Sequence, residues 1–214
     1  MKQKSENRKG IRYLLLLPLL FLVIYTAVSC GGGGGGDGGG GGNSGVGRNH
    51  VPSDEIAVAN GGFSITVYSR TASGDVTPLR TISGANTGLI IPQGIVGDTV
   101  NNEIVVTNLS NSITVYSRTA SGDVAPLRTI SGANTLLATP MGIAVDTVNN
   151  EITIVNRINN SITVYSRTAN GNVAPLRIIS GGSTGLLDPG GIVVDPVNNE
   201  IAVANWSNNS ITVY

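Results

Sequence analysis

The feature that most constrains the fold of this chain is a tandem repeat with a period of 48 or 49 residues. The segment Ser-Ile-Thr-Val-Tyr occurs four times, and its copies begin at Ser64, Ser112, Ser161 and Ser210. A Glu-Ile segment that ends in Asn five residues later recurs with the same period, and its copies begin at Glu55, Glu103, Glu151 and Glu200. Self-similarity at a period of this size indicates a repeat architecture in which each repeat is one supersecondary unit.

Each period contains four segments that are typical of short β-strands. Gly94–Asp98 in the second copy is almost continuously apolar, as expected of a strand that is buried on both faces. Glu103–Asn108 and Ser112–Arg118 alternate in polarity and are rich in β-branched residues. Pro126–Ser131 opens with proline, which suits the first residue of an edge strand. Turn-forming residues separate these segments, and no part of the period is typical of a helix.

Four antiparallel strands in about 48 residues form one blade of a β-propeller. The predicted fold class is therefore all-β, with four-stranded antiparallel blades. The first copy begins at its second strand and the last stops at its third, so we expect an incomplete arc of two full blades and two three-stranded partial blades. Within a repeat region at 51–214, the expected bounds are 54–84 and 189–214 for the partial blades and 92–132 and 140–181 for the full blades.

An open arc of this kind leaves two sheet faces uncovered. Closed propellers have about four to eight blades, and exposed sheet faces favour association. We therefore expect either that the chain is truncated relative to its relatives or that self-association completes the ring.

Residues 1–50 differ from the repeats in composition. A basic start followed by an uncharged run from Tyr13 to Ser29 is the layout of a secretory signal peptide over 1–29, and a transmembrane anchor is the alternative. The segment Ala27-Val28-Ser29-Cys30 resembles a bacterial lipobox, so Cys30 is the predicted lipid-attachment residue. Of the 30 glycines, 13 lie between Gly31 and Gly47, which predicts a flexible tether over 30–50. The expected location is the cell envelope, lipid-anchored, in the outer membrane of a Gram-negative bacterium.

Charge and composition exclude several classes of function. From Cys30 onward, eight Arg and twelve Asp or Glu give a formal net charge of −4, which argues against a nucleic-acid-binding surface. The single Cys and the single His lie outside the repeats, which excludes a disulfide framework, a thiolate zinc site and a Cys/His nucleophile pair within this chain.

The repeat carries a family resemblance. The segments Pro140–Asp146, Asn150–Asn156 and Ser161–Tyr165 together resemble the NHL-type blade and the related bacterial blades of lactonase-like and streptogramin-lyase-like propellers. The resemblance covers Asp54 to Tyr214 and implies a propeller fold, but such blades occur in binding modules and enzymes alike.

The resemblance also implies where an enzyme of this kind would carry its chemistry. The similar enzymes depend on ionisable residues, often His or Glu, in the central channel, and several use a divalent metal. In this chain His50 precedes the first blade, and the Glu residues repeat identically, as structural residues do. The sequence therefore predicts no catalytic residue, no metal site and no cofactor.

Polar residues that recur at strand ends have structural interpretations. The aspartates that end the first strands are expected to accept backbone N–H groups of the following turn, and a ring of metal ligands is the alternative. These residues are Asp98, Asp146 and Asp195. The asparagines that end the second strands are interpreted as turn formers beside the face where propellers bind ligands. They are Asn60, Asn108, Asn156 and Asn205.

Two further residue types recur within the third and fourth strands. The tyrosines are expected to pack between blades, and they are Tyr68, Tyr116, Tyr165 and Tyr214. The arginines of the outer strand are interpreted as solvated edge charges that discourage strand addition, and they are Arg80, Arg128 and Arg177.

The positions that break the repeat are the candidates for function. The loop between the second and third strands differs in each copy, and it supplies the candidate ligand-binding residues Phe63, Leu109, Arg157 and Trp206. The favoured function is a membrane-anchored binding or scaffold module that uses this loop face, with a protein or glycan ligand and no nucleic acid. The alternative is a remnant or subunit of a lactonase-like or lyase-like propeller enzyme.

Overall fold

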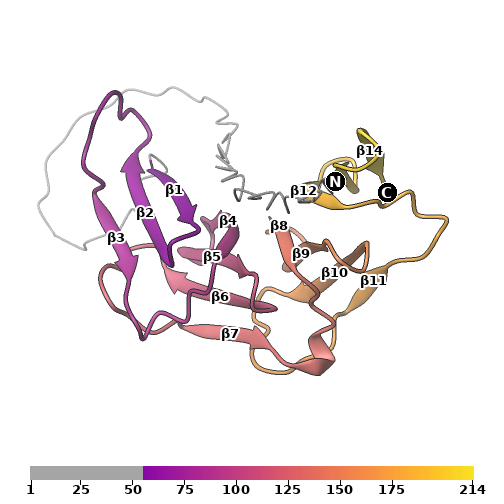
Figure 1. Cartoon of the computed structure of the whole chain (residues 1–214), viewed down its shortest axis with the longest axis horizontal. Coiled ribbons are helices and arrows are strands. Elements are labelled where there is room, and N and C mark those ends of the chain that lie inside the picture. Colours follow the sequence, from indigo (N-terminus) through magenta and orange to yellow (C-terminus); the bar gives the residue numbers. More distant parts are fainter. Residues whose placement is uncertain (1–54) are drawn as a thin grey trace, which may run out of the picture.

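A computed structural model describes residues 55–214, which form four antiparallel β-sheets (Figure 1). Sheet 1 contains β1 (Glu55–Asn60), β2 (Ser64–Ser69) and β3 (Arg80–Ser83). Sheet 2 contains β4 (Pro92–Asp98), β5 (Glu103–Asn108), β6 (Ser112–Ser117) and β7 (Arg128–Ser131). Sheet 3 contains β8 (Pro140–Asp146), β9 (Glu151–Asn156), β10 (Ser161–Ser166) and β11 (Arg177–Ile179). Sheet 4 contains β12 (Pro189–Asp195), β13 (Glu200–Asn205) and β14 (Ser210–Val213).

The sheets follow one another around an open arc, in the order of the sequence (Figure 1). Two four-stranded and two three-stranded antiparallel sheets confirm the predicted fold class. The predicted signal peptide, the lipid-attachment residue Cys30 and the glycine tether lie outside the described residues. Within residues 55–214, no helix has the length and apolar character needed to cross a membrane.

The hydrophobic core lies between the sheets, in three clusters. The cluster between sheets 1 and 2 contains Ile65, Val67, Ile82, Leu89, Ile95, Ile104, Val106 and Tyr116. The cluster between sheets 2 and 3 contains Val105, Ile113, Val115, Ile130, Leu137, Ile143, Ile152, Ile154 and Tyr165. The cluster between sheets 3 and 4 contains Ala144, Val155, Ile162, Leu186, Ile192 and Val203. Because side chains alternate along a strand, each inner sheet contributes one row of residues to each of its neighbours.

Three of the four tyrosines confirm the prediction that they pack between blades, whereas Tyr68 is in none of the clusters between sheets. Tyr116 is buried, and its hydroxyl donates a hydrogen bond of 2.5 Å to the Thr87 carbonyl oxygen. Tyr165 and Tyr214 make the equivalent bonds to the Thr135 and Thr184 carbonyl oxygens. Burial raises the pKa of Tyr116. The hydroxyl therefore stays a neutral donor that fixes the segment leading into each inner strand.

The innermost strands β4, β8 and β12 approach one another closely. A Cβ atom at Gly94 would lie 2.2 Å from the Met141 carbonyl oxygen, and one at Gly142 would lie 2.6 Å from that of Gly190. The pairing of β4 with β5 shifts register between Pro92 and Ile95, beside this glycine. Only a residue without a side chain fits where two backbones approach this closely.

Three strand-level expectations need correction. The fourth strand of sheet 2 begins at Arg128, two residues after Pro126, whose ring removes the N–H that a ladder needs. The third strand ends at Ser117, because the Arg118 N–H turns away to donate to the Asn102 carbonyl oxygen at 2.9 Å. A short 3-10 helix, Ala133–Thr135, occurs where no helix was expected.

Two of the three outer-strand arginines, Arg80 and Arg128, are not solvated edge charges. Arg80 donates two hydrogen bonds of 2.6 and 2.7 Å to the carboxylate of Glu55, across the intervening strand. Arg128 holds Glu103 in the same way, with two bonds of 2.6 Å. The prediction is wrong for this pair of arginines, because a carboxylate of the same sheet lies within their reach and only 16% of each side chain is exposed.

Candidate binding sites

Buried asparagines organise the loop face, which we define as the edge of the arc that carries the turns at 60–64, 108–112, 156–161 and 205–210. The Asn108 side-chain oxygen accepts a hydrogen bond of 3.1 Å from the Ile90 N–H, and its amide nitrogen donates to Thr114 Oγ1 at 3.1 Å. Asn156 and Asn205 make the equivalent contacts. Each asparagine therefore joins the segment that enters an inner strand to the adjacent hairpin, which is a structural role.

The residues that follow these three asparagines make equivalent backbone contacts. The backbone N–H groups of Leu109, Arg157 and Trp206 donate to the carbonyl oxygens of Ile91, Thr139 and Asp188 at 3.3, 3.1 and 3.1 Å. Three of the four candidate residues thus occupy the same place in successive sheets.

Phe63 occupies a different place in the repeat. It has a positive φ of 64°, a position that Asn111, Asn160 and Asn209 take in the later copies. Asn111 and Asn160 each accept a backbone N–H of the next sheet at 2.8 Å. Phe63 cannot accept such a bond, and half of its side chain is exposed. It lies on sheet 1, whereas Trp206 lies on sheet 4 at the other end of the arc (Figure 1).

The structure brings two of the candidates together and adds a residue that sequence reasoning missed. The Arg157 side chain donates to both carboxylate oxygens of Asp188, with the Nη2–Oδ2 distance at 3.2 Å. Its guanidinium carbon lies 5.0 Å from the centroid of the Trp206 ring, within the range of a cation–π contact. Ser207 Oγ also donates to Asp188 Oδ2 at 3.2 Å.

The ionic contact shifts the pKa of both partners. The hydrogen bond from Arg157 lowers the pKa of Asp188, against the opposing effect of burial. The same hydrogen bond raises the pKa of Arg157. Both groups are therefore charged at neutral pH, and the cluster presents a fixed guanidinium–carboxylate pair beside an indole ring.

A glycine makes room for the tryptophan. A Cβ atom at Gly190 would lie 2.2 Å from Trp206 Cε2, so the ring covers this part of the inner strand. The equivalent positions in sheets 2 and 3 are Gln93 and Met141. Trp206 and Gly190 thus differ from the repeat together, which gives sheet 4 its own loop surface.

The Arg157–Asp188 pair borders a shallow depression of about 440 Å³ on the loop face. Thr139, Asn160, Ile158 and Leu187 complete its lining. Ile158 is 75% exposed and Leu187 is also exposed, so apolar side chains flank the charged pair.

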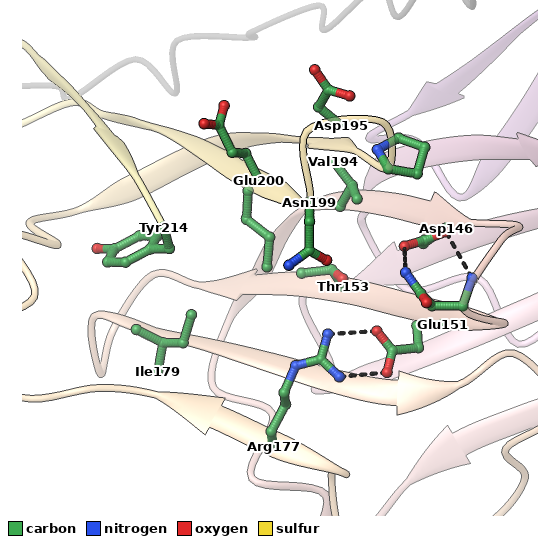
Figure 2. A pocket seen from close by; sticks show the side chains of 13 residues that line it. Asp146, Glu151, Thr153, Arg177, Ile179, Val194, Asp195, Asn199, Glu200 and Tyr214 are labelled. Carbon is green, nitrogen blue, oxygen red and sulfur yellow. Dashed lines mark hydrogen bonds and ion pairs between the residues drawn. The ribbon is translucent and has the colours of Figure 1, made fainter.

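A second pocket of about 200 Å³ lies at the opposite edge of the arc, between sheets 3 and 4 (Figure 2). Asp146, Glu151, Arg177, Asn199 and Tyr214 are among its lining residues. Arg177 donates two hydrogen bonds to the Glu151 carboxylate, and this contact raises the pKa of Arg177.

The aspartates beside this second pocket confirm the predicted turn role. Asp146 Oδ1 accepts the backbone N–H groups of Val148 and Asn149 at 2.8 and 3.0 Å. Burial raises the pKa of Asp146, but these bonds and that from the Asn149 side chain outweigh it, so the net shift is downward. Asp98 and Asp195 accept the equivalent turn bonds.

The sequence matches the family described as "Lactonase, 7-bladed beta-propeller" over residues 61–214. This chain belongs to that family. As a lactonase-family propeller it is also similar to a solved structure titled "Crystal structure of Nidogen/Laminin Complex", with a TM-score of 0.57 and 18% identity. The alignment covers 75% of this chain and 56% of the other, and at this identity it shows the fold alone. No curated protein matches the sequence.

Ionisable residues of this lactonase-family chain are spread along its repeats. Within residues 55–214, no group of three or more His, Cys, Asp or Glu side chains is placed to hold one metal ion. The carboxylates that are close to other charged groups are instead paired with arginines, as in Glu55–Arg80, Asp98–Arg167 and Asp188–Arg157.

Proposed function

We propose that this lactonase-family propeller is a binding module of the cell envelope that recognises a protein ligand at the loop face. The observation that carries the proposal is the cluster of Arg157, Asp188 and Trp206, with exposed Ile158 and Leu187 beside it. Trp and Arg are the residues most enriched in the energetic centres of protein interfaces. The indole offers apolar area, and the held guanidinium offers donors in a fixed direction.

The ligand-binding experiment compares two aromatic residues of the same face. The full chain in detergent is applied to peptide and glycan arrays, and affinity for the best ligand is then measured by calorimetry. We expect Trp206→Ala to weaken binding by about 30-fold, the scale of an interface hot spot. The matched control, Phe63→Ala, removes an exposed aromatic side chain at the other end of the arc and should leave affinity unchanged.

Two results would contradict this proposal. Equal losses in Trp206→Ala and Phe63→Ala would mean that the cluster has no special role. Binding to glycans alone would exclude a protein ligand and would assign the site to carbohydrate recognition.

The proposed anchor is a lipid on Cys30, supported by the lipobox-like segment Ala27-Val28-Ser29-Cys30 and by the glycine-rich stretch that follows. Several acyl chains on one residue anchor stably, because each buried methylene contributes about 0.8 kcal/mol. Metabolic labelling with a fatty acid should label the wild-type chain and not Cys30→Ser. Equal labelling of both chains would refute the anchor, and fractionation of the labelled protein tests the proposed outer-membrane location.

The family match favours a second candidate function, a lactonase-like or lyase-like enzyme or a subunit of one. The test is hydrolysis of a panel of lactones by the full chain, with and without added divalent metal. Turnover above the uncatalysed rate that a chelator abolishes would favour the enzyme. No turnover under either condition would leave the binding module as the better account.

A further inference from the structure

The buried interface between sheets 2 and 3 contains an arginine that is held by its whole side chain. Arg167 Nε and Nη2 donate to Asp98 Oδ2 at 2.9 and 2.6 Å, and Nη1 donates to Asn150 Oδ1 at 3.1 Å. Only 2% of each side chain in the Arg167–Asp98 pair is exposed. Sheet 2 supplies the carboxylate and sheet 3 supplies the arginine, so the pair crosses the interface.

The main chain of the same residue is held as well. The Arg167 N–H donates to the Asn150 carbonyl oxygen at 2.9 Å. Its carbonyl oxygen accepts a hydrogen bond of 2.6 Å from Arg128 Nη2. The Arg128 guanidinium also donates two hydrogen bonds to the Glu103 carboxylate, which fix its position. Four groups therefore define one receptor for an arginine residue: an aspartate, an asparagine, and an arginine paired with a glutamate.

The interface between sheets 1 and 2 holds the main chain of a second arginine in the same way. The Arg118 N–H donates to the Asn102 carbonyl oxygen at 2.9 Å, and the Arg118 carbonyl oxygen accepts from Arg80. The Arg118 guanidinium lies 3.7 Å from a carboxylate oxygen of Glu55. The main-chain part of the arrangement thus recurs at two interfaces, whereas the carboxylate beside the guanidinium is Glu55 at one and Asp98 at the other.

The same four groups recur between sheets 3 and 4, one period later. They are Asp146, Asn199, Arg177 and Glu151, and all four line the 200 Å³ pocket of Figure 2. Asn199 has a φ of 57°, against 58° for Asn150, so its main chain has the same left-handed conformation. In sheets 2 and 3 the held arginine follows the interface tyrosine by two residues, and the corresponding tyrosine of sheet 4, Tyr214, also lines this pocket.

We propose that this pocket, which we call the arginine socket, binds an arginine residue of a polypeptide segment in extended conformation. The ligand guanidinium donates to Asp146 Oδ2 and to Asn199 Oδ1, as Arg167 does to Asp98 and Asn150. The ligand N–H donates to the Asn199 carbonyl oxygen, and the ligand carbonyl oxygen accepts from Arg177. The socket is at the opposite edge of the arc from the loop face, so this inference does not depend on the proposed function.

The state of the socket residues agrees with this assignment. The Arg177 side chain is 52% exposed, against 16% for Arg128, so its guanidinium is accessible to a ligand. The lowered pKa of Asp146 keeps its carboxylate charged at neutral pH. Asp146 Oδ2 already accepts from the Asn149 side chain at 2.7 Å, and a carboxylate oxygen has a second lone pair for a guanidinium.

The geometry selects arginine over other cationic residues. Arg167 uses three different nitrogen atoms on two acceptors that lie on different sheets. Lysine offers a single point of donation and cannot reproduce this fork. Citrulline has the shape of arginine but no charge, so it separates charge-assisted recognition from simple fit.

The experiment uses a peptide that the chain itself suggests. Ser-Arg-Thr-Ala follows the tyrosine in the first three copies, at 69–72, 117–120 and 166–169. Binding of the blocked peptide to the full chain in detergent is measured by calorimetry, with the citrulline peptide as the comparison. We expect saturable binding of the arginine peptide that is at least about tenfold tighter than that of the citrulline peptide, because its hydrogen bonds are charge-assisted.

Two variants test whether the arginine peptide binds at Asp146. Asp146→Asn should weaken binding of the arginine peptide about tenfold, because the carboxylate loses its charge. Asp195→Asn is the matched control, because Asp195 lines the same pocket and accepts the same turn bonds. Its equivalent in sheet 3 is Asp146, whereas Arg167 donates to Asp98. This control should bind the peptide within about twofold of wild type, since an exposed charge that makes no direct contact with the ligand is screened.

Three outcomes would overturn the proposal. They are no saturable binding of the arginine peptide to the wild-type chain, equal binding of the citrulline peptide, and equal losses in Asp146→Asn and Asp195→Asn. If Asp146→Asn fails to fold, the comparison of the two peptides on the wild-type chain still decides.

Discussion

At the residue scale, the Arg167–Asp98 pair is the contact whose loss should cost most. It is buried and fully hydrogen-bonded between two sheets. Removing one partner of a buried ion pair leaves an uncompensated charge, at a cost of about 3–5 kcal/mol. We therefore expect Asp98→Asn to lower the free energy of unfolding by about 3 kcal/mol, as measured by urea denaturation.

The control for this substitution is Asp195→Asn, at the same place in sheet 4. Asp195 accepts the same two turn N–H bonds but has no arginine contact among the described residues. Its substitution should change stability by no more than about 0.5 kcal/mol. Equal shifts for the two variants would show that the turn, and not the ion pair, is responsible.

The Glu55–Arg80 pair predicts a dependence of stability on pH. The hydrogen bond from Arg80 lowers the pKa of Glu55, burial opposes this, and Arg118 lowers it further. A folded-state pKa below the unfolded value of about 4.3 gives stability that is fully present above that pH and is lost as pH falls through the folded-state value. Arg80→Gln should therefore cost about 1–2 kcal/mol at pH 7, since it removes hydrogen bonds to a charged group.

Thermal unfolding from about pH 7 down to about pH 2.5 checks this, across the range where carboxylates titrate. The difference between wild type and Arg80→Gln should shrink as the pH falls below about 4. A difference that stays constant over this range would mean that packing of the Arg80 side chain, rather than its charge, provides the stability.

The sequence predicts some of these residue roles and not others. An aspartate followed by Asn-Asn specifies its own turn, because all the partners lie within three residues. The prediction of solvated edge charges fails for Arg80 and Arg128, because their carboxylate partners are on a strand that is two places away in the sheet. The sequence does contain a signal for this pairing, because the glutamate precedes the arginine by 25 residues in the first two copies and by 26 in the third.

At the element scale, the close approach of the inner strands gives a sharp prediction. A Cβ atom at Gly94 would lie 2.2 Å from a backbone oxygen of β8, which no side-chain movement relieves. Gly97 lies on the same strand, and a Cβ atom there would have no neighbour within 4 Å. Gly94→Ala should therefore destabilise the chain by about 1–3 kcal/mol, the usual range for overpacking.

Gly97→Ala is the matched control and should be neutral or stabilising by up to about 1 kcal/mol, because it restricts the unfolded chain. Urea unfolding of both variants tests the pair. Equal stability of Gly94→Ala and Gly97→Ala would mean that the inner strands can separate without cost.

The strands were predictable from the sequence because alternation and turn residues are local signals that recur in every copy. Glu103–Asn108 has the same bounds in the structure as in the prediction. The loop-face cluster was only partly predictable. Asp188 belongs to the segment before an inner strand, and it meets Arg157 of the previous sheet only because the sheets pack side by side. The sequence pattern within one repeat therefore does not predict this contact.

At the scale of the whole molecule, the exposed face of sheet 4 duplicates one that is packed elsewhere. Glu-Ile-Ala-Val-Ala-Asn and Ser-Ile-Thr-Val-Tyr are identical in sheets 1 and 4. In sheet 1 the side chains facing sheet 2 are Ala57, Ala59, Ile65 and Val67. The same residues of sheet 4 are Ala202, Ala204, Ile211 and Val213. Ile211 is 72% exposed and Val213 is 57% exposed, whereas Ile65 and Val67 are buried.

The other end of the arc carries the complementary face. The residues of sheet 4 that pack on sheet 3 include Ile201, Val203 and Tyr214, and their copies in sheet 1 are Ile56, Val58 and Tyr68. The free face of sheet 4 therefore has the same residues as the face of sheet 1 that packs on sheet 2. The free face of sheet 1 has the same residues as the face of sheet 4 that packs on sheet 3. Burial of one Ile or Val side chain contributes about 1.5–3 kcal/mol, so a contact between these faces is favourable before the costs of association.

We accordingly predict that the 214-residue chain self-associates head to tail, with sheet 1 of one copy packed on sheet 4 of the next. Sedimentation velocity of the full chain in detergent should show a species larger than the monomer at low micromolar concentration. Ile211→Asp places a charge in the centre of this face and should shift the protein to monomer. Val197→Asp makes the same change at a turn residue that is 90% exposed and is not on the face, so it should leave the association unchanged. A wild-type chain that sediments as a sharp monomer, with an unfolding transition independent of concentration, would show that the free faces are stable in water and that this prediction is wrong.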